Sequence, residues 1–401
     1  MDRRQFLRST ATTLLCAPAL GFSGRLFAAP ADTPRFLLVF LRGGYDCNHL
    51  LVPYGSEFYY ESRPNLAIAR PDGSHPEAAV ALDAQWALGP AARDALLPYW
   101  QRKQLAFVPF AGTADLSRSH FETQDDIESG QAGGMHGHDR SGFLARLSGL
   151  LTGVPPIAFT RSLPLSLQGG GPVPNIALGG GGHARFDARQ ASILAGMYEG
   201  TALAPAAHEG LALQQEVAQD KQEEMLAASR GAPGAASFVT QTRRMAGLML
   251  GRYRLGFVDV GGWDTHVNQG GATGRLATSL ANLSAGLAAF GEALGAEWDN
   301  TVVVVISEFG RTFRENGDKG TDHGHGTAYW LMGGRVSGGR VAGEQVAVTV
   351  TAGNLLQNRD YPVLNNYRDV LGGVFRRLWG LSAGQVEHVF PGARPNDLGL
   401  V

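Results

Sequence analysis

Four stretches of predominantly apolar residues, each of strand length, set the kind of fold that this chain can adopt. They are residues 35–41 (RFLLVFL), 105–110 (LAFVPF), 255–260 (LGFVDV) and 301–306 (TVVVVI). A continuous apolar run predicts a strand that is covered on both faces, and the four consecutive valines favour extended backbone because they are β-branched. Shorter candidate strands are residues 157–160, 175–178 and 329–332.

Helices are predicted between these strands. From Leu276 to Leu294, apolar residues recur alternately four and three positions apart, which places them on one helical face. Further helices are predicted at residues 91–102, 211–228, 236–250 and 367–379. Strands that alternate with helices predict the α/β class, as a three-layer α/β/α sandwich around a mostly parallel sheet. We expect residues 32–401 to form a single domain, with a helical excursion near residues 182–233, where no convincing strand occurs.

The first 31 residues have the pattern of a twin-arginine export signal. Two arginines, Arg3 and Arg4, are followed by apolar residues and then by a weakly apolar run at residues 10–27. A membrane-spanning helix needs about 20 predominantly apolar residues, and this run is short and interrupted, so it predicts a cleaved signal. We expect cleavage after Ala31 and a mature protein that is periplasmic or secreted, with no membrane span and no lipid anchor.

The charge and cysteine content of the mature chain exclude some partners and bonds. Residues 1–31 hold four arginines and one aspartate, so their removal leaves 30 basic and 35 acidic residues and a formal net charge of −5. This balance argues against nucleic acid as a partner. The mature chain keeps a single cysteine, Cys47, so it has no internal disulfide and depends on its buried core for stability.

Carboxylates and imidazoles follow the predicted strands. Asp46 comes after the first long strand, Asp264-x-His266 after the third, and Glu308 and then Asp322-His323-x-His325 after the fourth. In open α/β sheets, ligands bind beyond the carboxyl ends of the strands, because the loops there converge on one crevice. Asp, Glu and His are the ligands that Zn²⁺ or Mn²⁺ accept. The pattern therefore predicts a divalent metal site.

Other polar side chains in these loops have two interpretations each. Arg42, Arg118 and Arg311 can bind ester oxyanions bidentately, or they can pair with neighbouring carboxylates. His136 and His138 have the spacing of a metal clip, but no clear strand ends beside them. We interpret these two histidines as turn or solvent-facing residues.

Five motifs carry a family resemblance: FLRGGYDCNHL, SRSHFETQD, GGWDTH, VISEFGRT and DHGHG. In this order, and over nearly the whole mature chain, they resemble an exported bacterial family, the domain-of-unknown-function family fifteen-oh-one. That family is similar to the alkaline phosphatase and sulfatase superfamily, so the resemblance implies an alkaline-phosphatase-like fold. It also implies a divalent metal, Zn²⁺ or Mn²⁺ with Mg²⁺ or Ca²⁺ as alternatives. The implied ligands are Asp46, Asp264, His266, Glu308 and one or both of His323 and His325, with Asp322 in reserve.

The resemblance places a nucleophile near Ser119, at the start of a helix. A serine there would gain from the positive end of the helix and from an adjacent metal, which together favour attack on phosphorus. The alternative is that Ser117 or Ser119 caps the helix.

Two departures from the superfamily pattern bear on the chemistry. Glu308-Phe309 stands where the superfamily has Asp-His, so one imidazole is missing unless Asp322-His323 supplies it. The sulfatase signature, Cys or Ser followed at +2 by Pro or Ala and at +4 by Arg, is absent at Cys47, Ser117 and Ser119. This disfavours a formylglycine nucleophile and a sulfate ester.

The leading expectation is an exported metal-dependent hydrolase or transferase that acts on a phosphate ester of a small molecule or a glycan. The alternative is a non-catalytic protein of the cell envelope that keeps the phosphatase-like fold to bind a metal, a glycan or another protein. A third expectation is a partner subunit for a second exported protein, because members of the family are often encoded beside one.

Overall fold

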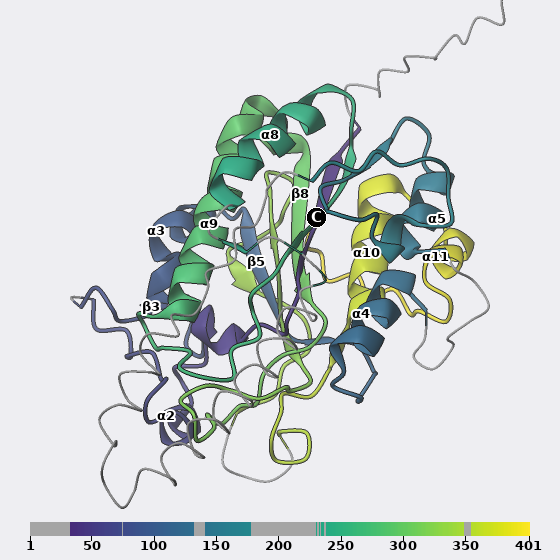
Figure 1. Cartoon of the computed structure of the whole chain (residues 1–401). Helices are drawn as coiled ribbons and strands as arrows, with labels where there is room; N and C mark the ends of the chain where they lie inside the picture. Colours follow the sequence, from purple (N-terminus) through teal and green to yellow (C-terminus); the bar gives the residue numbers. More distant parts are fainter. Residues whose placement is uncertain are drawn as a thin grey trace, which may run out of the picture.

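The computed structural model (Figure 1) describes residues 33–73, 75–131, 141–177, 230, 232, 234–235, 238–348 and 354–401. The expected signal, the predicted helix at residues 211–228, nearly all of the helical excursion, and His136 and His138 lie outside these residues.

An eight-stranded sheet forms the middle layer. Its strands are β1 (Arg35–Leu41), β5 (Leu105–Gly112), β6 (Pro156–Ala158), β7 (Leu255–Val260), β8 (Thr301–Ser307), β9 (Thr327–Met332), β10 (Arg340–Val341) and β11 (Asn365–Asn366). The order along the sheet is β10-β5-β9-β8-β1-β7-β6, and β11 also pairs with β5. β9 is antiparallel to β5 and β8, whereas the other pairings are parallel. The predicted mostly parallel sheet is confirmed.

Helices cover both faces of the sheet (Figure 1). One layer holds α3 (Pro90–Gln101), α8 (Phe238–Gly251) and α9 (Arg275–Leu294), and the other holds α4 (His120–Ser129), α5 (Phe143–Leu150), α10 (Tyr367–Trp379) and α11 (Ala383–Val389). Successive side chains of β1 serve the two layers in turn. Leu37 and Val39 pack in the core under the first layer, and Phe36 and Leu38 in the core under the second. The predicted three-layer sandwich is confirmed.

Several short elements are not predicted from the sequence. They are the antiparallel sheet of β2 (Leu51–Val52), β4 (Ala87–Leu88) and β3 (Val80–Ala81), the helix α2 (Glu57–Ser62), and the 3₁₀ helices η1 (Cys47–His49), η2 (Leu165–Leu167) and η4 (Gly295–Asn300). Strands and turns of two to six residues are too short to show a hydrophobic period. None of the described helices is both long and apolar enough to cross a membrane.

One predicted strand is wrong and one is displaced. The strand expected at residues 157–160 is β6, which ends at Ala158. The strand expected at residues 175–178 is reduced, within its described part, to a single bridge between Asn175 and Ala158. Pro174 has no N–H, so it cannot extend the ladder on that side. The helices predicted at 91–102, 236–250, 276–294 and 367–379 are confirmed as α3, α8, α9 and α10.

The sheet brings distant parts of the chain to one edge. β1, β5, β7 and β8 run in the same direction, so their carboxyl ends lie together. The loops that follow these strands, residues 42–50, 113–119, 261–274 and 308–326, meet at that edge.

Candidate metal centre

Three histidines and an aspartate meet at the carboxyl edge of the sheet, and we call His120, Asp264, His266 and His323 the histidine cluster. Nε2 of His323 lies 3.0 Å from Nε2 of His120 and 3.0 Å from Nε2 of His266. Asp264 Oδ1 lies 2.9 Å from Nε2 of His266 and 3.3 Å from Nε2 of His323. Asp264 Oδ2 lies 3.5 Å from Nε2 of His120. Imidazole nitrogens and a carboxylate thus face one small space.

Strand and helix ends position the cluster. His120 is the first residue of α4, and Asp264 and His266 follow β7. His323 lies in the loop between β8 and β9, which folds back on itself through a hydrogen bond from Gly324 N to Gly310 O at 2.8 Å. A Cβ atom at position 324 would lie 2.5 Å from the backbone of the opposing strand of the loop. Glycine at this position therefore allows the close approach that holds His323 in place.

Each imidazole turns its other ring nitrogen, Nδ1, toward an oxygen that accepts hydrogen bonds. The three contacts are His120 with Glu308 Oε1 at 2.9 Å, His266 with Asp322 Oδ1 at 3.1 Å, and His323 with the backbone oxygen of Arg118 at 3.0 Å. A neutral imidazole has one proton, so an Nδ1–H that is donated leaves a lone pair on Nε2. When the rings are neutral, the Nε2 lone pair of His323 faces that of His120 and that of His266, each at 3.0 Å; such lone pairs do not bond to one another, but they can bind a cation.

The spacing and chemistry of the cluster fit a metal ion. A tetrahedral Zn²⁺ site with Zn–N distances of about 2.1 Å has neighbouring ligand atoms about 3.4 Å apart. The ligand atoms of His120, Asp264 and His323 all lie within 4.8 Å of one another, and His266, outside this group of three, adjoins Asp264 and His323. Asp264 Oδ2 is buried and has no hydrogen-bond partner among the described residues, so it is an oxygen that a cation would satisfy. Metal-binding histidines commonly donate Nδ1 to a carboxylate or a carbonyl, as all three do here.

The charge around the cluster also matches a cation site. Burial alone would raise the pKa values of Asp264, Glu308 and Asp322, but hydrogen bonds hold all three pKa values below their usual range. Arg311 Nη1 donates to Asp264 Oδ1 at 2.6 Å. With neutral imidazoles, these three carboxylates and one guanidinium leave a net charge of −2. One divalent cation would balance this charge, and on binding it would displace the proton that His120 holds at pH 7 in its absence.

The histidines differ in how well they hold a proton. Burial opposes a charge on His120, but its contacts with the carboxylates of Asp264 and Glu308 outweigh burial and raise its pKa to about 9. Burial lowers the pKa of His323, despite its contact with Asp264. His323 is therefore neutral at pH 7, which is the form that a metal requires.

Asp46 does not belong to the histidine cluster, although the family resemblance implies that it is a ligand. Its carboxylate is buried against Arg63, with Nη1 at 2.5 Å from Oδ2 and Nη2 at 3.1 Å from Oδ1. Gln269 Nε2 donates to Oδ2 at 2.7 Å, and His49 Nδ1 lies 3.3 Å away. Both oxygens of Asp46 are thus used within the protein, whereas Asp264, which also contacts an arginine, keeps one oxygen beside His120 and His323 unpartnered in the described part of the chain.

The side chains of Glu308, Asp322 and His325 do not face the space between the Nε2 atoms either. Glu308 and Asp322 contact the Nδ1 side of histidines, where they orient the rings. His325 lies beside Asp115 and Arg118 instead, where burial and then the charge of Arg118 lower its pKa to about 4. Of the seven expected ligands, Asp264, His266 and His323 are the ones whose side chains face the common space.

The arginines that we predicted to bind substrate are all paired within the protein. Arg42 donates to Asp259 at 2.7 Å and to Glu128 at 2.8 Å, Arg118 to Asp360 at 2.7 Å, and Arg311 to Asp264 at 2.6 Å. Arg42 and Arg311 are buried. The pairing interpretation of these residues is the one that the structure supports.

His120 is the member of the cluster that sequence reasoning missed. It lies in the SRSH motif directly after the expected helix cap, whereas the candidate ligands were sought among strand-end loops and matched family positions. Its position in the sequence could have identified it. The first side chain of a helix that begins beside a metal site can point into that site.

Ser119 is the N-cap residue of α4. Its hydroxyl accepts a hydrogen bond from Glu122 N at 3.5 Å, which secures the first turn and with it His120. We expect Ser119→Ala to lower the free energy of unfolding by about 1 kcal/mol, because an N-terminal N–H loses its acceptor. Denaturant unfolding measures this change, with Ser382→Ala, which removes the cap of α11, as a comparable control. A Ser119→Ala variant as stable as the wild type would show that the hydroxyl does not act as a cap.

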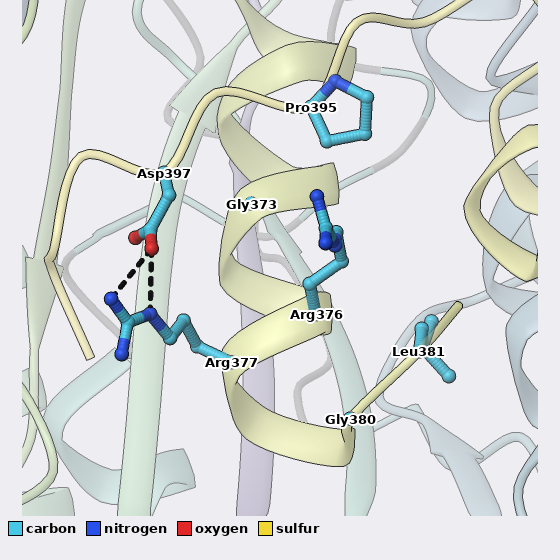
Figure 2. A pocket seen from close by; sticks show the side chains of 7 residues that line it. All are labelled: Gly373, Arg376, Arg377, Gly380, Leu381, Pro395 and Asp397. Carbon is cyan, nitrogen blue, oxygen red and sulfur yellow. Dashed lines mark hydrogen bonds and ion pairs between the residues drawn. The ribbon is translucent and has the colours of Figure 1, made fainter. Parts of the chain in front are cut away.

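A surface pocket lies away from the cluster, at the last turn of α10 (Figure 2). It has a volume of about 300 Å³ and its lining includes Arg377, which donates to Asp397 at 2.7 Å. Trp379, the last residue of α10, packs against Phe36 near the start of β1, with ring centroids 5.9 Å apart. The pocket is thus at the amino end of the strands, opposite the carboxyl edge that holds the histidine cluster.

Comparison with known proteins gives one family and a set of distant structures. The model of a family described as "Protein of unknown function (DUF1501)" matches residues 109–390, which is more than half of the chain. No curated protein matches.

Three solved structures are similar to this chain. The lipoteichoic acid synthase LtaP from Listeria monocytogenes is 8% identical, with a TM-score of 0.43 over 94% of this chain and 78% of that chain. A protein in the alkaline phosphatase superfamily from Vibrio parahaemolyticus is 8% identical, with a TM-score of 0.41 over 88% and 68%. Ps i-CgsB in complex with k-i-k-neocarrahexaose is 12% identical, with a TM-score of 0.41 over 91% and 75%.

Proposed function

This chain belongs to the DUF1501 family of proteins of unknown function, as its motifs predicted, and we propose that it is a hydrolase or transferase that depends on a divalent metal and acts on a phosphate ester. The proposed metal ligands are the histidine cluster, with Zn²⁺ or Mn²⁺ as the ion. The absent sulfatase signature favours phosphate over sulfate.

One observation carries the proposal. Nε2 of His323 faces Nε2 of His120 and Nε2 of His266, while the Nδ1 atom of each of these imidazoles contacts an acceptor. An arrangement of three imidazoles and a carboxylate is a donor set that zinc and manganese accept. A site that served stability alone would not bury a carboxylate oxygen without a hydrogen-bond partner beside three imidazoles.

Neighbouring residues orient the proposed ligands and leave one side of the centre accessible. Arg311 fixes the carboxylate of Asp264, and Glu308 fixes the ring of His120. The side chain of His120 is 3% exposed, whereas those of His266 and His323 are 14% and 16% exposed, so a substrate would approach from the side of His266 and His323. A divalent ion in this position would polarise an ester oxygen and stabilise the negative charge that develops on it.

A specific observation favours the non-catalytic alternative as a second candidate. The hydroxyl of Ser119 is used as a helix cap, and the three arginines expected to hold an ester are paired with carboxylates. In this case the protein would bind a metal without turning over an ester. Turnover of phosphate monoesters and diesters by metal-loaded wild type and Ser119→Ala separates the two functions. Turnover that is lost in Ser119→Ala with full metal content would assign the serine as nucleophile.

The proposal predicts that Glu308→Gln weakens metal binding by about 10-fold to 100-fold, because outer partners of metal-binding histidines contribute about this much to affinity. Glutamine removes the charge that orients His120 but keeps the shape of the side chain. Competition with a chromophoric chelator measures the dissociation constant. The control is Glu292→Gln on the exposed side of α9, which should bind metal like the wild type. Wild-type protein from its native compartment that contains no bound metal would overturn the proposed function.

We also propose that the protein is exported by the twin-arginine pathway, on the evidence of Arg3, Arg4 and the run that follows them. Amino-terminal sequencing of periplasmic or secreted protein tests this. A start near Asp32 is expected, and cytoplasmic protein that retains Met1 would contradict it.

A further inference from the structure

We propose that Arg118 is a positioning residue, which holds its own backbone carbonyl against Nδ1 of His323 and so keeps Nε2 of His323 free to bind the metal. This inference rests on the proposed metal centre. It gives Arg118 a different task from the substrate binding that the sequence suggested.

The backbone of Arg118 has an unusual conformation at the point of contact. Its φ is +54°, in the left-handed region that residues with a Cβ rarely adopt. In this conformation its carbonyl oxygen lies 3.0 Å from Nδ1 of His323. His120 and His266 receive the same support from carboxylate side chains, whereas His323 depends on this one backbone oxygen. An acceptor on a turn is effective when the turn is held rigidly.

The side chain of Arg118 supplies that rigidity. Its Nε and Nη2 atoms donate to Oδ2 of Asp360 at 3.0 and 2.7 Å, and Nη2 also donates to Gln357 Oε1 at 2.9 Å. The carboxylate of Asp360 is fully buried. On the other side of the turn, Ser117 donates to the carboxylate of Asp115 from both its backbone N–H and its hydroxyl. Residue 118 is therefore braced from two directions.

The segment that holds Arg118 also holds the loop of His323. Tyr361, next to Asp360, accepts a hydrogen bond from Gly326 N at 2.8 Å, and Arg359 accepts one from Phe313 N at 2.9 Å. Residues 356–361 thus contact both the turn that carries the acceptor and the loop that carries the imidazole. The Arg118–Asp360 pair fixes the distance between the two.

A comparison of Arg118→Ala with Arg118→Gly tests this inference. Both variants lose the contact with Asp360, but glycine adopts a positive φ without steric cost whereas alanine does not. We expect Arg118→Ala to raise the dissociation constant for Zn²⁺ by about 10-fold to 100-fold, the effect of losing a partner of a ligating histidine. Arg118→Gly should bind Zn²⁺ about tenfold more tightly than Arg118→Ala. The absorption bands of bound Co²⁺ should shift in the alanine variant and return toward those of the wild type in the glycine variant.

Lys103 provides a matched control, because its φ is +59° and it lies in the turn before β5, at the opposite edge of the sheet. Lys103→Ala and Lys103→Gly should differ in thermal stability but bind Zn²⁺ equally. If Arg118→Ala does not fold, Asp360→Asn, which weakens the same clamp, should show the weaker binding. Wild-type binding of Zn²⁺ in all Arg118 and Asp360 variants, or equal losses in the alanine and glycine variants, would overturn the positioning role. A wild type that binds no Zn²⁺, by contrast, would overturn the proposed function itself.

Discussion

His323→Ala is expected to abolish metal binding at the carboxyl edge of the sheet. Nε2 of His323 lies 3.0 Å from the Nε2 atoms of both other histidines, so its removal opens the middle of the donor set. The loss of affinity should exceed about 100-fold, the upper range for partners that do not touch the metal. Addition of Zn²⁺ should raise the melting temperature of the wild type and leave that of His323→Ala unchanged, because a ligand stabilises the state that binds it.

His75→Ala is the matched control, because His75 is exposed on a loop outside the cluster. It should bind Zn²⁺ and respond to it in thermal unfolding like the wild type. If His323→Ala retains one tightly bound metal per chain, the ion lies at a different place and the assignment of the cluster is wrong. Any ester turnover by the wild type should disappear in His323→Ala together with the metal.

The layers of the fold could be predicted because each long element has a strong period. β1, β7 and β8 begin at the predicted residues, and α10 has the predicted bounds, since a buried strand needs a continuous apolar run and a helix needs one apolar face. The direction of β9 was not predictable in this way, because hydrophobic pattern does not distinguish parallel from antiparallel neighbours. β10 and β11 are two residues long and depend on tertiary contacts with β5.

The sequence predicts the location of the candidate site better than it predicts which residues are its ligands. Strand order brings Asp264, His266 and His323 together, and the rule about the carboxyl ends of strands anticipated this. The rule does not predict which of the carboxylates at the strand ends form buried ion pairs with arginines elsewhere in the chain. Arg63 lies in a segment with no recognisable period, yet it removes Asp46 from the candidate ligands. His120 was missed because it begins a helix, whereas the ligands were expected in the loops.

Arg63→Leu is expected to be among the most destabilising single changes in the chain. The guanidinium of Arg63 is buried and contacts both oxygens of Asp46, and it also donates to the backbone oxygens of Thr312 and Phe313. Leucine would leave the carboxylate of Asp46 buried without its cation, at a cost of about 3–5 kcal/mol in the free energy of unfolding. Urea unfolding at pH 7 measures the change.

The pH dependence and a second variant identify the cause of this loss. In the wild type, burial would raise the pKa of Asp46, but the charge of Arg63 holds it well below its usual range, so the contribution of Asp46 to stability is present at neutral pH and lost only in strong acid. In Arg63→Leu the pKa of Asp46 should rise above its unfolded value, so the stability difference from wild type should shrink as the pH falls from 7 toward 4. Adding Asp46→Asn to Arg63→Leu should recover part of the stability at pH 7. Asp46→Asn alone should keep the bound metal, because Asp46 lies outside the histidine cluster, and loss of the metal in that variant would instead make Asp46 a ligand.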